Sequence, residues 1–176
     1  MDYVRIYDSP LGRITITSDG ENLTGLWFEG QKHRPSSLSG HKGCPPVLQE
    51  TERWLDLYFS GNDPGFTPPL RMEGTVFQKE IWKILLTVPY GNTTTYGEIA
   101  NAYASAHGSG RMSAQAVGGA VSRNPISIIV PCHRVLGAKG NMTGYAGGLW
   151  RKETLLKLEQ SIGSSQNFRG LKCRNR

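Results

Sequence analysis

The sequence lacks an apolar run long enough to cross a membrane, and its start lacks the pattern of a secretory signal. None of its apolar stretches approaches the roughly 20 residues that a membrane-spanning helix needs. The first ten residues, MDYVRIYDSP, contain no basic region followed by an apolar segment. We therefore expect a cytoplasmic protein with no membrane partner.

Cysteine is also scarce. The 176 residues include three cysteines, Cys44, Cys132 and Cys173, which cannot all pair and whose spacing is not that of a disulfide framework. This usage favours a reducing compartment. His33, His41 and Cys44 could begin a zinc site, but the polar segment around them supplies no fourth ligand. We expect neither a metal nor an organic cofactor.

Acidic residues become sparse after residue 70. Residues 1–70 contain six Lys/Arg and nine Asp/Glu, a net charge of −3, whereas residues 71–160 contain ten against five, a net charge of +5. Residues 161–176 contain four Lys/Arg and no acidic residue, a net charge of +4. A basic second half is typical of proteins that bind a polyanion such as nucleic acid. Ordinary solubility charge explains the same numbers, so both interpretations stay open here.

Residues 1–70 have the pattern of a small sheet domain with one helix. Residues 3–7, 14–17 and 23–28 are rich in β-branched and aromatic residues and are separated by turn sequences, which predicts three strands. The segment PVLQETERWLDLYFSG predicts a helix with one apolar face. That face comprises Val47, Leu48, Thr51, Trp54, Leu55 and Tyr58. The linker-like NDPGFTPP then places a domain boundary near residues 69–72.

Residues 71–160 have a helical pattern instead. The segment TVFQKEIWKILLTVP predicts an amphipathic helix, and further helices are expected from about residue 96, over 114–123 and over 151–160. The apolar stripe of the first comprises Phe77, Ile81, Ile84, Leu85 and Val88. Three short helices in a basic region suggest a helix-turn-helix-like module. Residues 161–176 form a basic tail without periodicity, which we expect to be disordered.

The helix predicted over AQAVGGAVSR has an unusually small-sided face. Ala116, Gly119 and Ala120 lie at i, i+3 and i+4, and so share one face. Each mid-helix glycine lowers the stability of the helix by roughly 1 kcal/mol relative to alanine, so we expect the small residues to serve a packing or binding role. It could pack tightly against a neighbouring helix, or it could allow a nucleic-acid backbone to approach closely.

The segment IIVPCHRVLG raises the question of what Cys132 does. A cysteine after an apolar run is most often core filler. Pro131 fixes the backbone before this thiol, while His133 and Arg134 bring potential cations that would favour the reactive thiolate. In an extended segment, however, residues 132 and 133 point in opposite directions. A working cysteine–histidine pair therefore requires a sharp turn or a bridging water.

This segment, followed by GNMTGYAGG, resembles the active-site signature of the O6-alkylguanine-DNA alkyltransferases, also called methylated-DNA–protein-cysteine methyltransferases. The motifs VPYGNTTTYGEIA, AVGGAVSRNP, PCHRV, TGYAGG and RKETLLKLE follow in family order at close to family spacing across about residues 74–160. Residues 1–70 are similar more loosely, in length and strand pattern. We expect the bacterial constitutive type, because the sequence shows no cysteine-rich regulatory domain ahead of these motifs.

The resemblance implies an α+β fold. Residues 1–70 would form a ribonuclease-H-like support domain with a small β-sheet and a helix. Residues 71–160 would form a helical, winged helix-turn-helix-like domain that binds DNA and carries the active-site cysteine. Cys132 would accept the alkyl group, His133 would act as base through a water, and Glu159 would orient the imidazole, by the logic of a catalytic triad.

The resemblance also implies the residues around the substrate. Arg134 would hold the active-site turn, and Asn124 would tie the DNA-binding helix to it. Tyr96 and Tyr145 would line the pocket, the carbonyls of Cys132 and Val135 would accept from the guanine amino group, and the Ala146 N–H would point at O6. Gln115 stands where the family often has an arginine that fills the stack left by the base. The DNA-binding set comprises Gln115, Ala116, Gly118, Gly119, Arg123 and Arg111.

The implied function is DNA repair by direct reversal. One molecule would bind the minor groove of double-stranded DNA as a monomer, flip out an O6-alkylguanine, and take its alkyl group once, with O4-alkylthymine as a further possible substrate.

Two alternative functions remain open at this point. A thiol peptidase or acyltransferase would need an oxyanion hole and a Cys–His–Asn pattern that we do not locate. A redox-sensing regulator would need a polar major-groove reading helix, which AQAVGGAVSR is too small-sided to provide.

Overall fold

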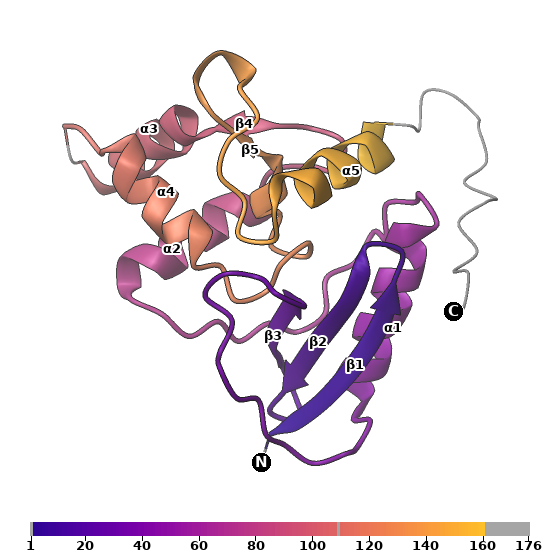
Figure 1. The fold of residues 1–176 in the computed structure, drawn as a ribbon. Helices are drawn as coiled ribbons and strands as arrows, with labels where there is room; N and C mark the ends of the chain where they lie inside the picture. Colours follow the sequence, from indigo (N-terminus) through magenta and orange to yellow (C-terminus); the bar gives the residue numbers. More distant parts are fainter. Residues whose placement is uncertain (1, 109, 161–176) are drawn as a thin grey trace.

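A computed structural model describes residues 2–108 and 110–160. It confirms the α+β class and the three strands predicted in the first part of the chain (Figure 1). The strands β1 (Tyr3–Ser9), β2 (Gly12–Ser18) and β3 (Leu23–Phe28) form one antiparallel sheet in that order. Helix α1 (Pro46–Phe59) lies along this sheet.

The burial of α1 follows its sequence periodicity. The buried residues of the helix are the six that its apolar face predicts: Val47, Leu48, Thr51, Trp54, Leu55 and Tyr58. The Trp54 indole Nε1 donates to the Phe66 carbonyl at 2.8 Å, which attaches the following segment to the helix. The prediction of this face is confirmed, because side chains at i, i+3 and i+4 lie over the same sheet.

The remaining residues form a mainly helical part. It contains α2 (Val76–Leu86), α3 (Tyr96–His107), α4 (Ala114–Ser122) and α5 (Leu149–Gln160), a parallel pair of two-residue strands β4 (Thr94–Thr95) and β5 (Val135–Leu136), and the 3-10 turns η1 (Cys132–Arg134) and η2 (Ala138–Gly140). Thr75 and Thr95 begin α2 and α3 with reciprocal capping boxes. Gly108 ends α3 in the left-handed conformation at φ 60°.

The apolar stripe predicted for α2 is partly wrong. Ile81 and Leu85 are buried as expected, but Trp82 is buried with them at 1% exposure. Its indole Nε1 donates to the Ala120 carbonyl of α4 at 2.9 Å. The predicted members Phe77, Ile84 and Val88 are only half-buried, and Val88 lies beyond the end of the helix. Trp82 changes which face of α2 is buried, because its large ring and its N–H both find partners between the helices.

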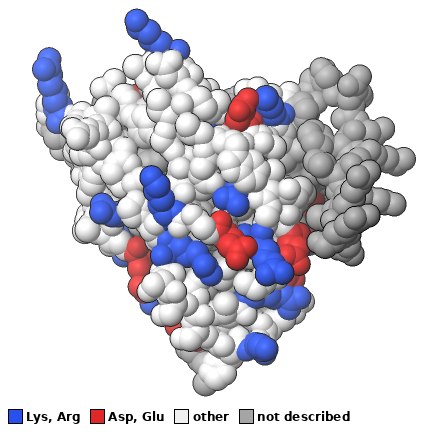
Figure 2. All heavy atoms as spheres, in the orientation of Figure 1, with Lys and Arg blue, Asp and Glu red and all other residues white. Residues whose placement is uncertain are grey.

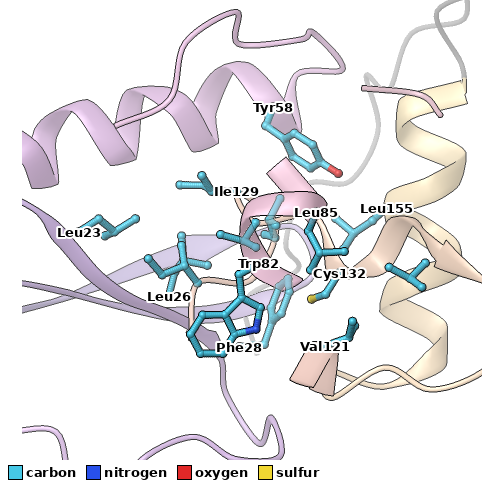
Figure 3. Close-up of a cluster of buried hydrophobic side chains, with 14 of the residues drawn as sticks. Leu23, Leu26, Phe28, Tyr58, Trp82, Leu85, Val121, Ile129, Cys132 and Leu155 are labelled. Atoms are coloured by element: carbon cyan, nitrogen blue, oxygen red, sulfur yellow. The ribbon is translucent and has the colours of Figure 1, made fainter. Parts of the chain in front are cut away.

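One continuous core joins the sheet to the helical part. Figure 3 shows β3 side chains, Leu26 and Phe28 among them, in one cluster with Trp82 and Cys132. The backbone is continuous as well, because Leu26 N–H donates to the Pro125 carbonyl and Ser127 N–H to the Leu26 carbonyl, both at 2.9 Å. The sheet thus supports the segment that leads to the cysteine.

Two expectations concern the outside of this core. Among the described residues, every helix is too short or too polar to cross a bilayer. The basic tail predicted over residues 161–176 lies outside the described residues.

We expect Trp82→Ala to lower the free energy of unfolding by about 3–5 kcal/mol, because it removes a buried indole and one of the hydrogen bonds to the Ala120 carbonyl. Urea unfolding followed by circular dichroism measures this loss. Trp150→Ala is the control, since Trp150 is 54% exposed, and it should cost less than about 1 kcal/mol. Equal losses in the two variants would contradict the assignment of Trp82 to the core.

Candidate active site

The apolar lead-in ends in a sharp turn at the cysteine. Ile128 adopts a left-handed φ of 69°, and residues Cys132–Arg134 form a 3-10 turn. The turn is closed by hydrogen bonds from Cys132 N–H to the Val130 carbonyl at 2.8 Å and from Arg134 N–H to the Pro131 carbonyl at 3.0 Å. The chain is therefore not extended at this point. The thiol and the imidazole can both enter one site from adjacent positions.

The Cys132 thiol is buried and held by an amide. It is 4% exposed, and Asn124 Nδ2 donates to its sulfur at 3.1 Å and to the Val130 carbonyl at 2.8 Å. Asn124 Oδ1 accepts from Ile126 N–H at 3.0 Å, which fixes the amide orientation. Asn124 thus connects the end of α4 to the cysteine turn.

Burial raises the pKa of Cys132 to about 11, although the Asn124 amide and the charge of Lys152 both act to lower it. The resting thiol is therefore protonated at neutral pH, and attack requires a base that removes the proton. This differs from the expectation that His133 and Arg134 would favour the thiolate. Burial lowers the pKa of His133 although Glu159 opposes the change, so the imidazole is neutral, and the Arg134 guanidinium faces Glu159 instead.

His133 and Glu159 form a buried pair. His133 Nε2 lies 2.6 Å from Glu159 Oε1, and the two side chains are 0% exposed. The pKa of Glu159 falls to about 2 despite its burial, because His133 and Arg134 donate to the carboxylate. An ionised Glu159 therefore accepts from Nε2–H, which leaves the lone pair of the neutral imidazole on Nδ1. Nδ1 is buried and has no hydrogen-bond partner among the described residues.

Arg134 holds the carboxylate of this pair in place through hydrogen bonds. Its Nε donates to Glu159 Oε2 at 2.8 Å and its Nη2 to Oε1 at 3.0 Å, while Nη1 donates to the Val88 carbonyl at 2.6 Å. The guanidinium therefore fixes the carboxylate and the segment after α2 together.

A pocket of about 230 Å³ opens onto Cys132. Its walls come from the helical part and from the segment after β3: Lys32, His33, Tyr96, Gly118, Val121, Ser122, Gly144, Tyr145 and Ala146. Three of the residues expected around the substrate, Tyr96, Tyr145 and Ala146, are among them. The Tyr96 hydroxyl donates to the Gly144 carbonyl at 3.3 Å, which ties α3 to the opposite wall.

Val135 and Asn124 are not among the residues that line the pocket. Val135 is fully buried, its N–H donates to the Cys132 carbonyl, and its own carbonyl accepts from Lys152 Nζ at 2.5 Å. Both carbonyls expected to meet the guanine amino group therefore already accept one hydrogen bond. A carbonyl oxygen has two lone pairs and can accept a second hydrogen bond.

Helix α4 borders the pocket with a face that divides into two parts. Ala120 is buried against α2, so the packing interpretation is correct for this residue. Gly119 is different, because a side chain added there would meet no described atom within 4 Å. Gln115 and Ala116 are exposed at the start of the helix, and Gly118 lines the pocket. The part that faces solvent next to the pocket can therefore accept a close ligand.

The basic residues of the DNA-binding set are more scattered. Arg123 is exposed just after α4, whereas Arg111 lines a separate hollow beside the end of α3. On the face drawn in Figure 2, Lys and Arg are dispersed, and most of the acidic side chains lie over the sheet domain. The placement of the acidic side chains agrees with the higher content of Asp and Glu in residues 1–70.

Several residues at the site were not predicted from the sequence. Lys152 is fully buried in α5, and its Nζ also donates to the Thr143 carbonyl at 2.5 Å. Lys32 donates its N–H to the Ala146 carbonyl at 3.0 Å, and His33 adopts a left-handed φ of 62° on the pocket wall. The described His, Cys, Asp and Glu residues form no cluster of three that could hold a metal, so His33 does not join the zinc site considered above.

Comparison with protein families gives two matches that together span most of the chain. Residues 76–161 match the 6-O-methylguanine DNA methyltransferase DNA-binding domain, and residues 3–72 match the ribonuclease-like domain of the same family. Proteins named methylated-DNA–protein-cysteine methyltransferase include one from Mycobacterium leprae, 46% identical over 91% of this chain and 93% of the relative. Another, from Methanosarcina acetivorans, is 45% identical over 90% of this chain and 99% of the relative.

A solved structure extends this similarity to the fold. Mycobacterium tuberculosis OGT in complex with DNA is 43% identical, covers 90% of this chain and 93% of its own, and superposes with a TM-score of 0.78. The α+β arrangement of a small sheet domain followed by a helical domain is thus shared.

The lowered pKa of Glu159 predicts how stability depends on pH. Its folded value of about 2 lies below the ordinary 4.5, so the carboxylate stabilises the fold fully above about pH 4.5 and less as the pH falls toward 2. The free energy of unfolding of wild type should exceed that of Glu159→Gln by about 2–3 kcal/mol at pH 6, and this difference should shrink by pH 3. Urea unfolding across this range measures it. Glu153→Gln, on the same helix but exposed, should show a much smaller change, and a constant gap for Glu159→Gln would contradict the prediction.

Proposed function

The chain belongs to the methylated-DNA–protein-cysteine methyltransferase family, and from this premise we propose that Cys132 is the residue that accepts the alkyl group. The chain is a DNA-binding repair methyltransferase. The single observation that carries the assignment is the burial of Cys132 at a pocket bordered by α4, with the Asn124 amide donating a hydrogen bond to its sulfur. Family membership decides against the peptidase and redox-regulator alternatives.

We propose O6-alkylguanine in double-stranded DNA as the substrate, with O4-alkylthymine as a secondary one. A thiol that is 4% exposed cannot reach a base inside the stack, so the nucleotide must rotate out of the duplex into the pocket. Tyr96 and Tyr145 would contact the flipped base, the Ala146 N–H would point at O6, and the carbonyls of Cys132 and Val135 would accept from the amino group.

The transfer needs one proton to move. His133 Nδ1 would take the proton of the Cys132 thiol through a bridging water, and Glu159 would hold the imidazole in the tautomer that permits this. The sulfur then forms a bond to the alkyl carbon while the carbon–O6 bond breaks, and its electron pair stays on guanine. The product thioether is stable, so each molecule would act once, as a monomer.

Helix α4 would contact the minor groove of DNA. Its small, solvent-facing positions Ala116 and Gly119 leave room for the sugar–phosphate backbone, and Gly118 leads from this face into the pocket. Gln115, at the exposed start of the helix, would fill the stack that the base leaves, while Arg111 and Arg123 would contact phosphates. We propose residues 71–160 as this functional domain and residues 1–70 as its support.

Cys132→Ala should abolish transfer and leave DNA affinity within about twofold, because the buried thiol makes no phosphate contact. Intact-mass measurement after mixing with O6-methylguanine duplex should show wild type heavier by one methyl group in place of a hydrogen, mapped to Cys132, and the variant unchanged. Cys44→Ala is the control and should react like wild type. Transfer to Cys44 or Cys173 in the Cys132→Ala variant would overturn the assignment.

Gln115→Ala should slow single-turnover repair of duplex DNA about tenfold, because the vacated stack is no longer filled. Repair of the same lesion in a single strand should change less than twofold, since no paired stack has to be replaced. Gln115→Arg should tighten duplex binding and steepen its dependence on salt by about one counterion. Equal losses on both substrates for Gln115→Ala would show that the residue shapes the pocket instead.

A further inference from the structure

The sheet domain reaches the active site through one hydroxyl. Tyr58 lies near the end of α1 and is fully buried. Its hydroxyl donates to Glu159 Oε1 at 2.7 Å and lies 3.3 Å from His133 Nε2. Its ring meets the His133 imidazole edge to face, with 6.4 Å between the centroids. Figure 3 shows Tyr58 extending from its helix toward the elements of the helical domain.

We propose that Tyr58 is a positioning residue of the His133–Glu159 pair, so that residues 1–70 form part of the active site rather than only its support. The proposal rests on the function proposed above, in which His133 is the base. Tyr58 would act through Glu159, without touching the substrate.

The protonation of the group supports this role. Burial and the neighbouring Glu159 raise the pKa of Tyr58 well above its ordinary value. The phenol therefore keeps its proton at physiological pH and can only donate to the carboxylate. A hydroxyl is costly to bury without a partner, and a phenylalanine would fill the same space. The hydroxyl therefore contributes its hydrogen bond rather than its volume.

The contacts of Glu159 show what that hydrogen bond controls. Oε1 accepts from Tyr58, His133 and Arg134 Nη2, and Oε2 accepts from Arg134 Nε and from Gly91 N–H at 3.0 Å. Among the described residues, Tyr58 is the one donor to this carboxylate that comes from the sheet domain. It shares Oε1 with His133, so it both fixes that oxygen and withdraws negative charge from it.

Loss of the hydroxyl therefore has a defined electrostatic consequence. Oε1 would become more negative toward Nε2–H, and the pKa of His133 would rise. The other ionisable groups that act on His133 or Glu159 are unchanged by the substitution: Arg134 from the turn, Lys152 from α5, Tyr90 from the segment after α2 and Tyr145 from the pocket wall. A shift of the His133 pKa would thus report on Tyr58 itself.

Tyr58→Phe tests the proposal, and Tyr7→Phe is its matched control. The Tyr7 hydroxyl donates to Asp56 Oδ1 on the same helix at the same 2.7 Å, away from the site. In Tyr58→Phe we expect the single-turnover rate on O6-methylguanine duplex to fall about tenfold and the acidic limb of its pH profile to move up by about half a pH unit or more. Tyr7→Phe should leave both unchanged.

A second measurement needs no substrate. Two-bond ¹H–¹⁵N spectra of histidine-labelled protein report the tautomer and the pKa of His133, with His133→Gln identifying its signal among the four histidines. We expect the Nε2–H tautomer in wild type and a higher His133 pKa in Tyr58→Phe. An unmoved His133 pKa and pH limb would overturn the proposal, even if the rate fell, because packing alone would then explain the residue. Wild type that gains no methyl group on Cys132 would instead refute the proposed function.

Discussion

The site depends on one buried carboxylate. Glu159 receives hydrogen bonds from three separate segments, through Tyr58, Gly91 and the neighbouring pair His133 and Arg134, and it is 2% exposed. A buried charge is tolerable only when it is paired and its lone pairs are satisfied. The buried carboxylate therefore requires each of these donors to stay in place. Their hydrogen bonds hold α1, the segment after α2, the cysteine turn and α5 in fixed positions relative to one another. The geometry of the proposed catalytic pair and the packing of the two parts of the chain are consequences of the same interaction.

Local periodicity predicted much of the fold. The strands and the buried face of α1 follow from alternation and from i, i+3, i+4 spacing, which are properties of neighbouring residues. The stripe of α2 was partly wrong, because the burial of Trp82 depends on the Ala120 carbonyl, 38 positions away. The partnership of Tyr58 with Glu159 spans 101 positions, and no local pattern distinguishes this tyrosine from its apolar neighbours on the helix. Such pairings are set by tertiary structure.

The candidate site could have been predicted further than it was. Lys152, Leu155, Leu156 and Glu159 stand at i, i+3, i+4 and i+7 in α5, so a lysine and a glutamate occupy the buried stripe of that helix. Charged residues at buried positions are rare unless they are paired, and this spacing marked both as candidates. The protonation state of Cys132 could not be predicted, because the adjacent His133 and Arg134 suggest a thiolate. Only the folded structure turns both toward Glu159 and leaves the sulfur among apolar side chains and an amide.

A protonated resting thiol suits the proposed reaction, in which each molecule acts once. An exposed thiolate attacks any small electrophile or disulfide that reaches it, and each such event would consume a molecule. Burial raises the pKa of Cys132 to about 11, which suppresses those reactions, while the neutral His133 keeps a lone pair nearby. Reactivity then requires a substrate that fills the pocket and brings its electrophilic carbon to the sulfur at the moment the proton leaves. The same burial that slows the thiol therefore makes the pocket, rather than the intrinsic nucleophilicity of the sulfur, the determinant of what is repaired.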